Sequence, residues 1–177
     1  MKILEDLFLP TYFVNHFSAI TPEVLKEKGY KAVLIDLDNT LVAYDEANSN
    51  EVVNAWFNAL DESEIKIMIV SNGKYDRVSE FSEPEEFIYI DSARKPFSKG
   101  FMKAMRAFGV YPHETLMIGD QVMTDVLGSR RVGVDSALVR PIKDKDALAT
   151  KLNRFIESLI MKQFKRKGLV NWRETLE

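Results

Sequence analysis

Carboxylates and a hydroxyl follow two apolar runs of the sequence, in positions where they could handle a phosphoryl group. Asp36 and Asp38 come just after the run 31–35, and Ser71 follows the run 65–70. A carboxylate is ionised at pH 7 and can attack phosphorus, exchange a proton or bind a hard cation. A serine hydroxyl can hydrogen-bond a phosphoryl oxygen. These residue types therefore suit phosphoryl transfer.

A lysine and two more aspartates occur further along the chain. Lys95 lies beyond the run 87–90, and Gly119-Asp120 ends the run 115–118, with Asp125 five residues later. Lysine can neutralise charge on a phosphate, and the added carboxylates suit Mg²⁺. Any one of these elements is a weak signal, because Asp and Ser are common in turns after strands. All of them in one order are far more specific.

The apolar runs predict the strands that position these residues. They cover 31–35, 65–70, 87–90, 115–118 and 136–139, and each is continuous rather than alternating. That pattern is typical of strands buried on both faces of a parallel sheet. In such a sheet ligands bind beyond the carboxyl ends of the strands, so the polar residues should converge there.

Amphipathic stretches between the runs predict helices. Thr21-Pro22 and Gly29 mark the two ends of one, and others cover 51–60, 98–109 and 145–164. Alternating strands and helices indicate an open α/β sheet with right-handed crossovers and helices on both faces. The apolar stripes expected to face the core are Val52, Val53, Trp56, Phe57 and Leu60, then Phe101, Met102, Met105 and Phe108, and finally Leu148, Leu152, Phe155 and Leu159.

The motifs Asp-x-Asp-x-Thr at 36–40, Ser71, Lys95 and Gly-Asp-x-x-x-x-Asp at 119–125 together resemble the haloacid-dehalogenase superfamily of phosphohydrolases. The resemblance covers roughly 31–140. The surrounding segments DLDNTLV, ARKP and GDQVMTDV are similar to the YqeG-type branch of subfamily IIIA. This resemblance implies a three-layer Rossmann-like fold and a Mg²⁺-dependent phosphomonoester hydrolase.

The resemblance also implies roles for the motif residues. Asp36 would be the nucleophile that forms an aspartyl-phosphate, Asp38 the general acid and base, and Lys95 a catalytic cation. Thr40, Ser71 and Asn72 would bind the phosphate, although Thr40 would chiefly support the loop. The metal ligands would be Asp36, Asp38 (through its carbonyl), Asp120 and Asp125. Whether Asp125 binds the metal directly stays open.

The motif spacing predicts an open site. The intervals from Thr40 to Ser71 and from Ser71 to Lys95 each hold one helix and one strand, with no room for a cap domain. Such a site suits a bulky phosphorylated substrate. The YqeG-type resemblance extends to mitochondrial phosphatidylglycerophosphate phosphatases, so a lipid phosphate is a candidate. We expect 1–30 to form a helical lead packed on the core and 31–177 to form the phosphatase domain.

Composition limits the possible partners, nucleophiles and cellular location of the protein. The net charge is −3 and there is no cysteine, so we expect no nucleic-acid partner, and a thiol nucleophile is excluded. No apolar run approaches the roughly 20 residues that span a bilayer. We therefore expect a cytoplasmic protein, with peripheral contact at the inner membrane face as an option. The apolar segment 7–17 favours a helix on the flank of the sheet over shallow membrane contact.

Two non-catalytic interpretations compete with a phosphatase. One is a receiver-like phosphoacceptor, and the other is a degenerate haloacid-dehalogenase-like scaffold that binds a partner. A receiver places its phosphorylated Asp on a strand after the acidic pair, and here Asp91 is the only candidate. Intact Asp36, Asp38, Lys95 and Asp120 favour the enzyme.

Overall fold

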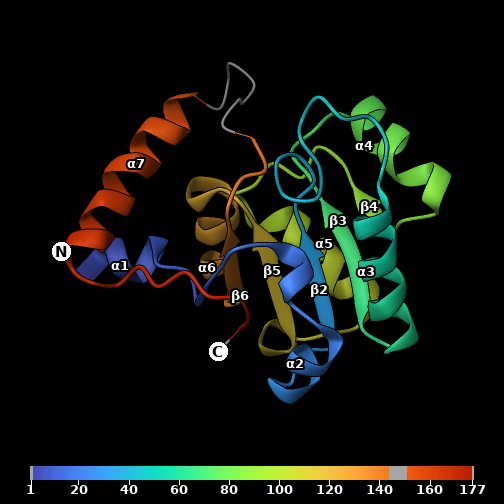
Figure 1. Ribbon diagram of the computed structural model, residues 1–177, viewed down its shortest axis with the longest axis horizontal. Helices are drawn as coiled ribbons and strands as arrows, with labels where there is room; N and C mark the ends of the chain where they lie inside the picture. The colour runs from blue at the N-terminus through green and yellow to red at the C-terminus, as the bar shows by residue number, and fades with distance from the viewer. Residues whose placement is uncertain (1, 144–150, 177) are drawn as a thin grey trace.

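Six parallel strands form one sheet in the computed structural model, which describes residues 2–143 and 151–176 (Figure 1). Their order across the sheet is β1-β6-β5-β2-β3-β4, which places β2 between β5 and β3. The segments that follow these three strands therefore leave the sheet side by side. The strands are β1 Tyr12–Val14, β2 Ala32–Ile35, β3 Lys66–Val70, β4 Tyr89–Ile90, β5 Thr115–Gly119 and β6 Asp135–Val139.

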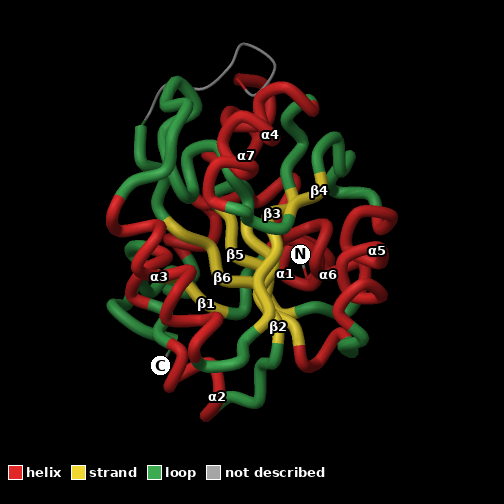
Figure 2. The backbone as a smooth tube through the Cα atoms, turned by 90° about the vertical axis from the view of Figure 1, so that its right-hand side faces the viewer, coloured by secondary structure: helices red, strands yellow, loops and turns green. Residues whose placement is uncertain are grey.

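Helices cover both faces of the sheet, as the edge-on view in Figure 2 shows. One face packs against α2, α3 and α4, and the other packs against α5 and α6. This arrangement confirms the predicted three-layer α/β fold. The helices are α1 Lys2–Phe8, α2 Pro22–Glu27, α3 Glu51–Glu62, α4 Tyr75–Ser82, α5 Ser98–Phe108, α6 Leu127–Val132 and α7 Lys151–Arg166, with short helical turns at Phe17–Ala19, Glu83–Glu85, Pro112–Glu114 and Val122–Val126.

The central strands are buried on both sides, as their continuous apolar sequences predict. On β2, Val33 and Ile35 face one apolar cluster, whereas Leu34 faces the other. Alternate residues of a strand point to opposite faces, so a strand covered on both faces must be apolar throughout. The sheet thus forms a rigid base for the loops at its carboxyl edge.

The N-terminal segment 7–17 differs from its prediction as a flanking helix. α1 ends at Phe8, and Tyr12–Val14 form β1, which pairs with β6 in parallel. Aromatic and β-branched residues favour a strand, and the pairing covers backbone groups that β6 would otherwise expose. Phe13, Val14 and Phe17 are buried, so these three side chains are unavailable for membrane contact.

The face that α7 turns to the core also differs from its prediction. Phe155 and Leu159 are 62% and 54% exposed, whereas Glu157, Ile160 and Phe164 are buried. A hydrogen bond fixes this rotation, because a Glu157 carboxylate oxygen accepts from the backbone N–H of Met123 at 2.9 Å. Phe155 and Leu159, the two members of the expected stripe whose side chains the structure describes, therefore face outward.

Smaller differences concern single residues of the predicted stripes. Val52 on α3 and Met102 on α5 are exposed, although their neighbours Val53 and Phe101 are buried. Leu148 lies outside the described residues. None of the helices described is both long and apolar enough to cross a membrane.

Candidate active site

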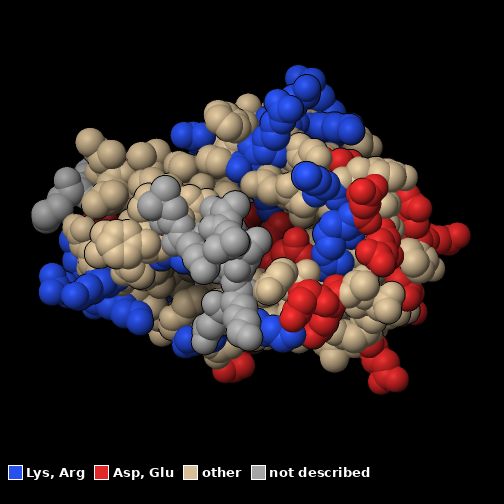
Figure 3. All heavy atoms as spheres, turned by 90° about the horizontal axis from the view of Figure 1, so that it is seen from above, with Lys and Arg blue, Asp and Glu red and all other residues tan. Residues whose placement is uncertain are grey.

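A hollow opens at the carboxyl edge of the sheet. Seen from above, it contains acidic side chains and has basic side chains beside it (Figure 3). Its volume is about 420 Å³, and Asp36, Asp38, Ser71 and Lys95 are among the residues that line it. The fold thus brings together motif residues that are far apart in the sequence.

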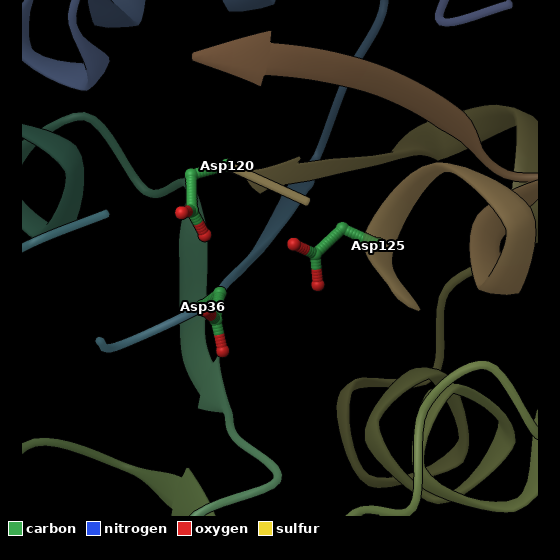
Figure 4. A group of neighbouring side chains, drawn as sticks. All are labelled: Asp36, Asp120 and Asp125. Atoms are coloured by element: carbon green, nitrogen blue, oxygen red, sulfur yellow. The ribbon is translucent and has the colours of Figure 1, made fainter. Parts of the chain in front are cut away.

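Three buried carboxylates meet at the base of this edge (Figure 4). One oxygen each of Asp36, Asp120 and Asp125 lies within 4.8 Å of the others. Asp36 is held next to β5 because its N–H donates to the carbonyl of Ile118 at 2.9 Å, one residue beyond the end of β2. Neighbouring parallel strands therefore bring Asp36 and Asp120 together.

Lys95 links two of these carboxylates. Its Nζ lies 2.7 Å from Oδ1 of Asp36 and 2.7 Å from Oδ1 of Asp125. Burial by itself would lower the pKa of Lys95, but the Asp125 and Asp36 carboxylates raise it above its ordinary value. The lysine is therefore a fixed positive charge inside the site.

Asn72 positions the backbone of Lys95. The Asn72 side-chain oxygen accepts from the Lys95 N–H at 2.6 Å, and the Asn72 amide nitrogen donates to the Lys95 carbonyl at 2.9 Å. The Asn72 side chain therefore joins the segment after β3 to the segment after β4. Ser71 lines the hollow next to it, and its Oγ accepts from the N–H of Gly73 at 3.0 Å.

Among the described residues, the three carboxylates of the cluster outnumber the two cations paired with them, Lys95 and Arg154. Burial raises the pKa of Asp120, an effect that Arg154 opposes and the Asp36 and Asp125 charges increase. Burial also raises the pKa of Asp125, against the opposing effect of Lys95. Clustered hard oxygen donors with unbalanced charge fit a divalent cation such as Mg²⁺.

The loop that follows β2 curls back on itself. Asn39 adopts a left-handed conformation (φ 64°), which its short polar side chain tolerates, and its N–H donates to the Val42 carbonyl at 2.7 Å. Thr40 is buried, and its hydroxyl donates to Oδ1 of Asp120 at 3.3 Å. Thr40 thus supports the loop and holds a carboxylate of the cluster.

Asp38 lies apart from the cluster and is paired with Arg77. Nε and Nη2 of Arg77 lie 3.1 and 2.9 Å from the same Asp38 oxygen, Oδ1. Burial raises the pKa of Asp38, the Arg77 charge counteracts this, and the Asp36 charge adds to it. The net upward shift favours a carboxyl group that can carry a proton.

The site is open. Throughout residues 36–98, all of which the structure describes, the chain forms loops, α3, β3, α4, β4 and one short helical turn, and it forms no cap domain. The predicted absence of a cap is therefore confirmed for this segment.

Three charged residues at the site were missed by the sequence analysis. Arg77 follows Ser71 by six residues, at the start of a helix, and this position could have suggested it. Arg154 and Glu157 lie on α7 and approach Asp120 and Met123. No motif marks them, because only the docking of α7 brings them near.

The fold and the site define a hydrolase of the haloacid-dehalogenase type. Residues 92–159 match the family model described as HAD-hydrolase-like. The chain belongs to the haloacid-dehalogenase superfamily, to its YqeG-type branch, and it is a phosphatase. It is 42% identical over 172 residues to the Bacillus subtilis protein named "Probable phosphatase YqeG", which covers 97% of this chain and 100% of that protein.

Further relatives share the family or the fold. The chain is 30% identical over 175 residues to phosphatidylglycerophosphate phosphatase 1, chloroplastic/mitochondrial, of Arabidopsis thaliana, which covers 91% of this chain and 49% of that protein. The cobalt-bound deoxy-D-mannose-octulosonate 8-phosphate phosphatase of Haemophilus influenzae has a TM-score of 0.51 at 15% identity, over 77% of this chain and 90% of that one. The subfamily IIIA hydrolase of Legionella pneumophila has a TM-score of 0.50 at 16% identity, over 83% and 91%. The two structures support the fold.

Proposed function

We propose that this phosphatase is a Mg²⁺-dependent phosphomonoester hydrolase that forms an aspartyl-phosphate on Asp36. One observation carries the proposal. Among the residues that the structure describes, Asp36 alone belongs to the carboxylate cluster and also lines the hollow. A carboxylate in both places can bind the metal and reach the phosphorus of a substrate. Asp120 and Asp125, with the backbone carbonyl of Asp38, would complete the protein's share of the metal ligands.

The proposed reaction has two steps. An Asp36 oxygen bonds to phosphorus while the bond from phosphorus to the leaving oxygen breaks, and Asp38 gives that oxygen a proton. Asp38 then takes a proton from water, whose oxygen attacks phosphorus, so that inorganic phosphate is released and Asp36 is regenerated. Bound Mg²⁺ would supply positive charge near the phosphoryl oxygens. Lys95 and Ser71 stabilise the same oxygens and keep the group in line.

A lipid phosphate is the proposed substrate class. The open site leaves room for a bulky leaving group, and the Arabidopsis relative is named for a lipid substrate. A membrane would present such a substrate, so the protein needs a surface that contacts one.

We assign membrane contact to the outward face of α7. Exposed Phe155 and Leu159 are followed on this helix by exposed Lys162, Lys165 and Arg166. Apolar side chains beside a basic group suit the interface of an anionic bilayer. Arg154, next to Phe155 in sequence, contacts Asp120 of the site. Contact through this helix would therefore bring the bilayer close to the hollow.

The test is hydrolysis of p-nitrophenyl phosphate with Mg²⁺ and with EDTA. We expect the wild type to turn over this substrate only with the metal. Asp36→Asn should abolish turnover and Asp38→Asn should severely impair it. Asp61→Asn, on an exposed turn of α3, is the control and should leave turnover unchanged. Beryllofluoride should bind the wild type at Asp36 in a Mg²⁺-dependent manner. Equal rates in wild type and Asp36→Asn would refute the proposal. Stable phosphorylation of Asp36 without turnover would favour the non-catalytic phosphoacceptor.

A further inference from the structure

Arg77 lies at the border of the hollow and is held on two sides. Two of its nitrogens donate to one oxygen of Asp38, and its guanidinium carbon lies 5.8 Å from the centre of the Phe81 ring. The side chain is only 20% exposed. These contacts fix a planar, permanently charged donor beside the proposed acid.

The third nitrogen of this guanidinium is not used within the described structure. Nη1 of Arg77 is buried and has no hydrogen-bond partner among the described residues. Buried donors in proteins nearly always have partners, so an unpaired one indicates a missing ligand or a rearrangement when a ligand binds. Two other cations near the site already have carboxylate partners, because Lys95 binds Asp36 and Asp125 and Arg154 binds Asp120.

The position of Arg77 indicates which part of a substrate it would meet. In the proposed function, which this inference extends, Asp38 gives its proton to the leaving oxygen. Arg77 contacts Asp38, so it lies on the leaving-group side of the phosphorus. Lys74, which is exposed and lines the same hollow, adds a second positive charge.

We propose that Arg77, with Lys74, forms a subsite for a second anionic group on the leaving part of the substrate. A guanidinium can bind two oxygens of a phosphodiester or a carboxylate at once. When such a group binds, Arg77 exchanges Asp38 for the substrate anion, and Asp38 is free to approach the leaving oxygen. The enzyme therefore prefers phosphomonoesters whose alcohol part is itself an anion.

Three soluble substrates test the preference. Glycerol 3-phosphate carries no second anion, glycerophosphoglycerol phosphate carries a phosphodiester, and 3-phosphoglycerate carries a carboxylate. We expect the wild type to have a lower KM for one or both of the latter two. Arg77→Gln should raise KM for the preferred substrate about ten- to hundredfold, the range of a lost charge-assisted hydrogen bond. Its effect on KM for glycerol 3-phosphate should be about threefold or less.

Matched variants separate charge from geometry. Arg77→Lys keeps the positive charge but not the paired N–H donors of the guanidinium. Its KM for the preferred substrate should lie between those of the wild type and Arg77→Gln. Arg106→Gln removes an exposed arginine from the last turn of α5 and should behave as the wild type. A preference for the phosphodiester alone would name that group as the ligand, and equal preference would extend the subsite to carboxylates. Equal losses of kcat/KM on all three substrates would overturn the proposal and leave Arg77 as a residue that only positions Asp38.

A binding measurement keeps this test independent of catalysis. Glycerophosphoglycerol, the alcohol product that retains the phosphodiester, should bind the wild type about ten- to hundredfold more tightly than Arg77→Gln by calorimetry. This difference should persist in an Asp36→Asn background. If the difference persists but protein with Asp36 intact turns over no substrate, the phosphatase mechanism fails and the subsite stands. Equal binding to both proteins would refute the subsite alone.

Discussion

The Arg154 guanidinium binds both the backbone carbonyl and the side-chain carboxylate of Asp120. Nη1 of Arg154 donates to the Asp120 carbonyl at 3.0 Å, and Nη2 pairs with the Asp120 carboxylate. Glu157, one turn later on α7, pairs with Arg154 at 3.2 Å and accepts from the N–H of Met123. Helix α7 therefore fixes the position of the loop that carries Asp120 and Asp125. This helix lies outside the recognisable motifs.

Arg154→Gln should destabilise the metal-free protein more than the Mg²⁺-saturated protein. Without Arg154, Lys95 is the one cation that the described residues still pair with the three buried carboxylates. Breaking a partly buried pair of this kind lowers the free energy of unfolding by up to about 3 kcal/mol. A bound divalent cation supplies the missing charge, so most of the loss should disappear with Mg²⁺. Thermal unfolding in EDTA and in MgCl₂ measures both values.

Arg166→Gln is the matched control, because Arg166 is exposed at the far end of the same helix. Its melting temperature should follow the wild type in both conditions. If Arg154→Gln lowered stability equally with and without Mg²⁺, Arg154 would be a packing contact with no electrostatic link to the cluster.

Gly119→Ala should abolish metal binding. A Cβ at Gly119 would lie 2.2 Å from Oδ2 of Asp125, so the carboxylate would have to move. Gly128→Ala is the control for overpacking, since its Cβ would strike the Phe101 ring at 2.6 Å and none of its three nearest atoms belongs to a carboxylate. Both variants should lose about 1–3 kcal/mol of stability from overpacking. Calorimetry with Mg²⁺ should show binding to Gly128→Ala and none to Gly119→Ala, and normal binding to Gly119→Ala would contradict the predicted role of Asp125.

The double variant Phe155→Ser/Leu159→Ser should weaken binding to anionic vesicles. Inserting two such side chains contributes a few kcal/mol, so the bound fraction at limiting lipid should fall about tenfold or more. Co-sedimentation with vesicles of phosphatidylglycerol and phosphatidylcholine measures this. Ile88→Ser removes an apolar side chain that is 56% exposed beside β4 and should bind as the wild type does. Identical binding by all three proteins would show that α7 is not the membrane surface, whereas turnover of p-nitrophenyl phosphate should persist in every case.

Much of the candidate site was predictable because all strands of a parallel sheet end at the same edge, so the residues that follow them lie close together. Asp36, Ser71 and Asp120 follow strands whose apolar runs are continuous, and β2 lies between β3 and β5. Neighbouring strands place their last residues side by side, so the spacing of the motifs was enough to bring these side chains to one edge.

The N-terminal strand and the rotation of α7 were not predictable from local patterns. Tyr12–Val14 are too few for a periodicity to separate strand from helix, and they form β1 because β6 offers an edge. On α7, Phe155 and Leu159 have the spacing of a core stripe. Yet the hydrogen bonds of Arg154 and Glu157 to the loop after β5 turn the helix so that this stripe faces solvent.

The sequence by itself determined the α/β class, the order of the motifs and the chemistry that their side chains can perform. These properties depend on residue types and on contacts between adjacent strands. Tertiary structure alone decided that Arg77 pairs with Asp38 and that Arg154 closes on Asp120. Each contact joins elements distant in the chain, and its geometry depends on how a whole helix packs, which no local spacing encodes.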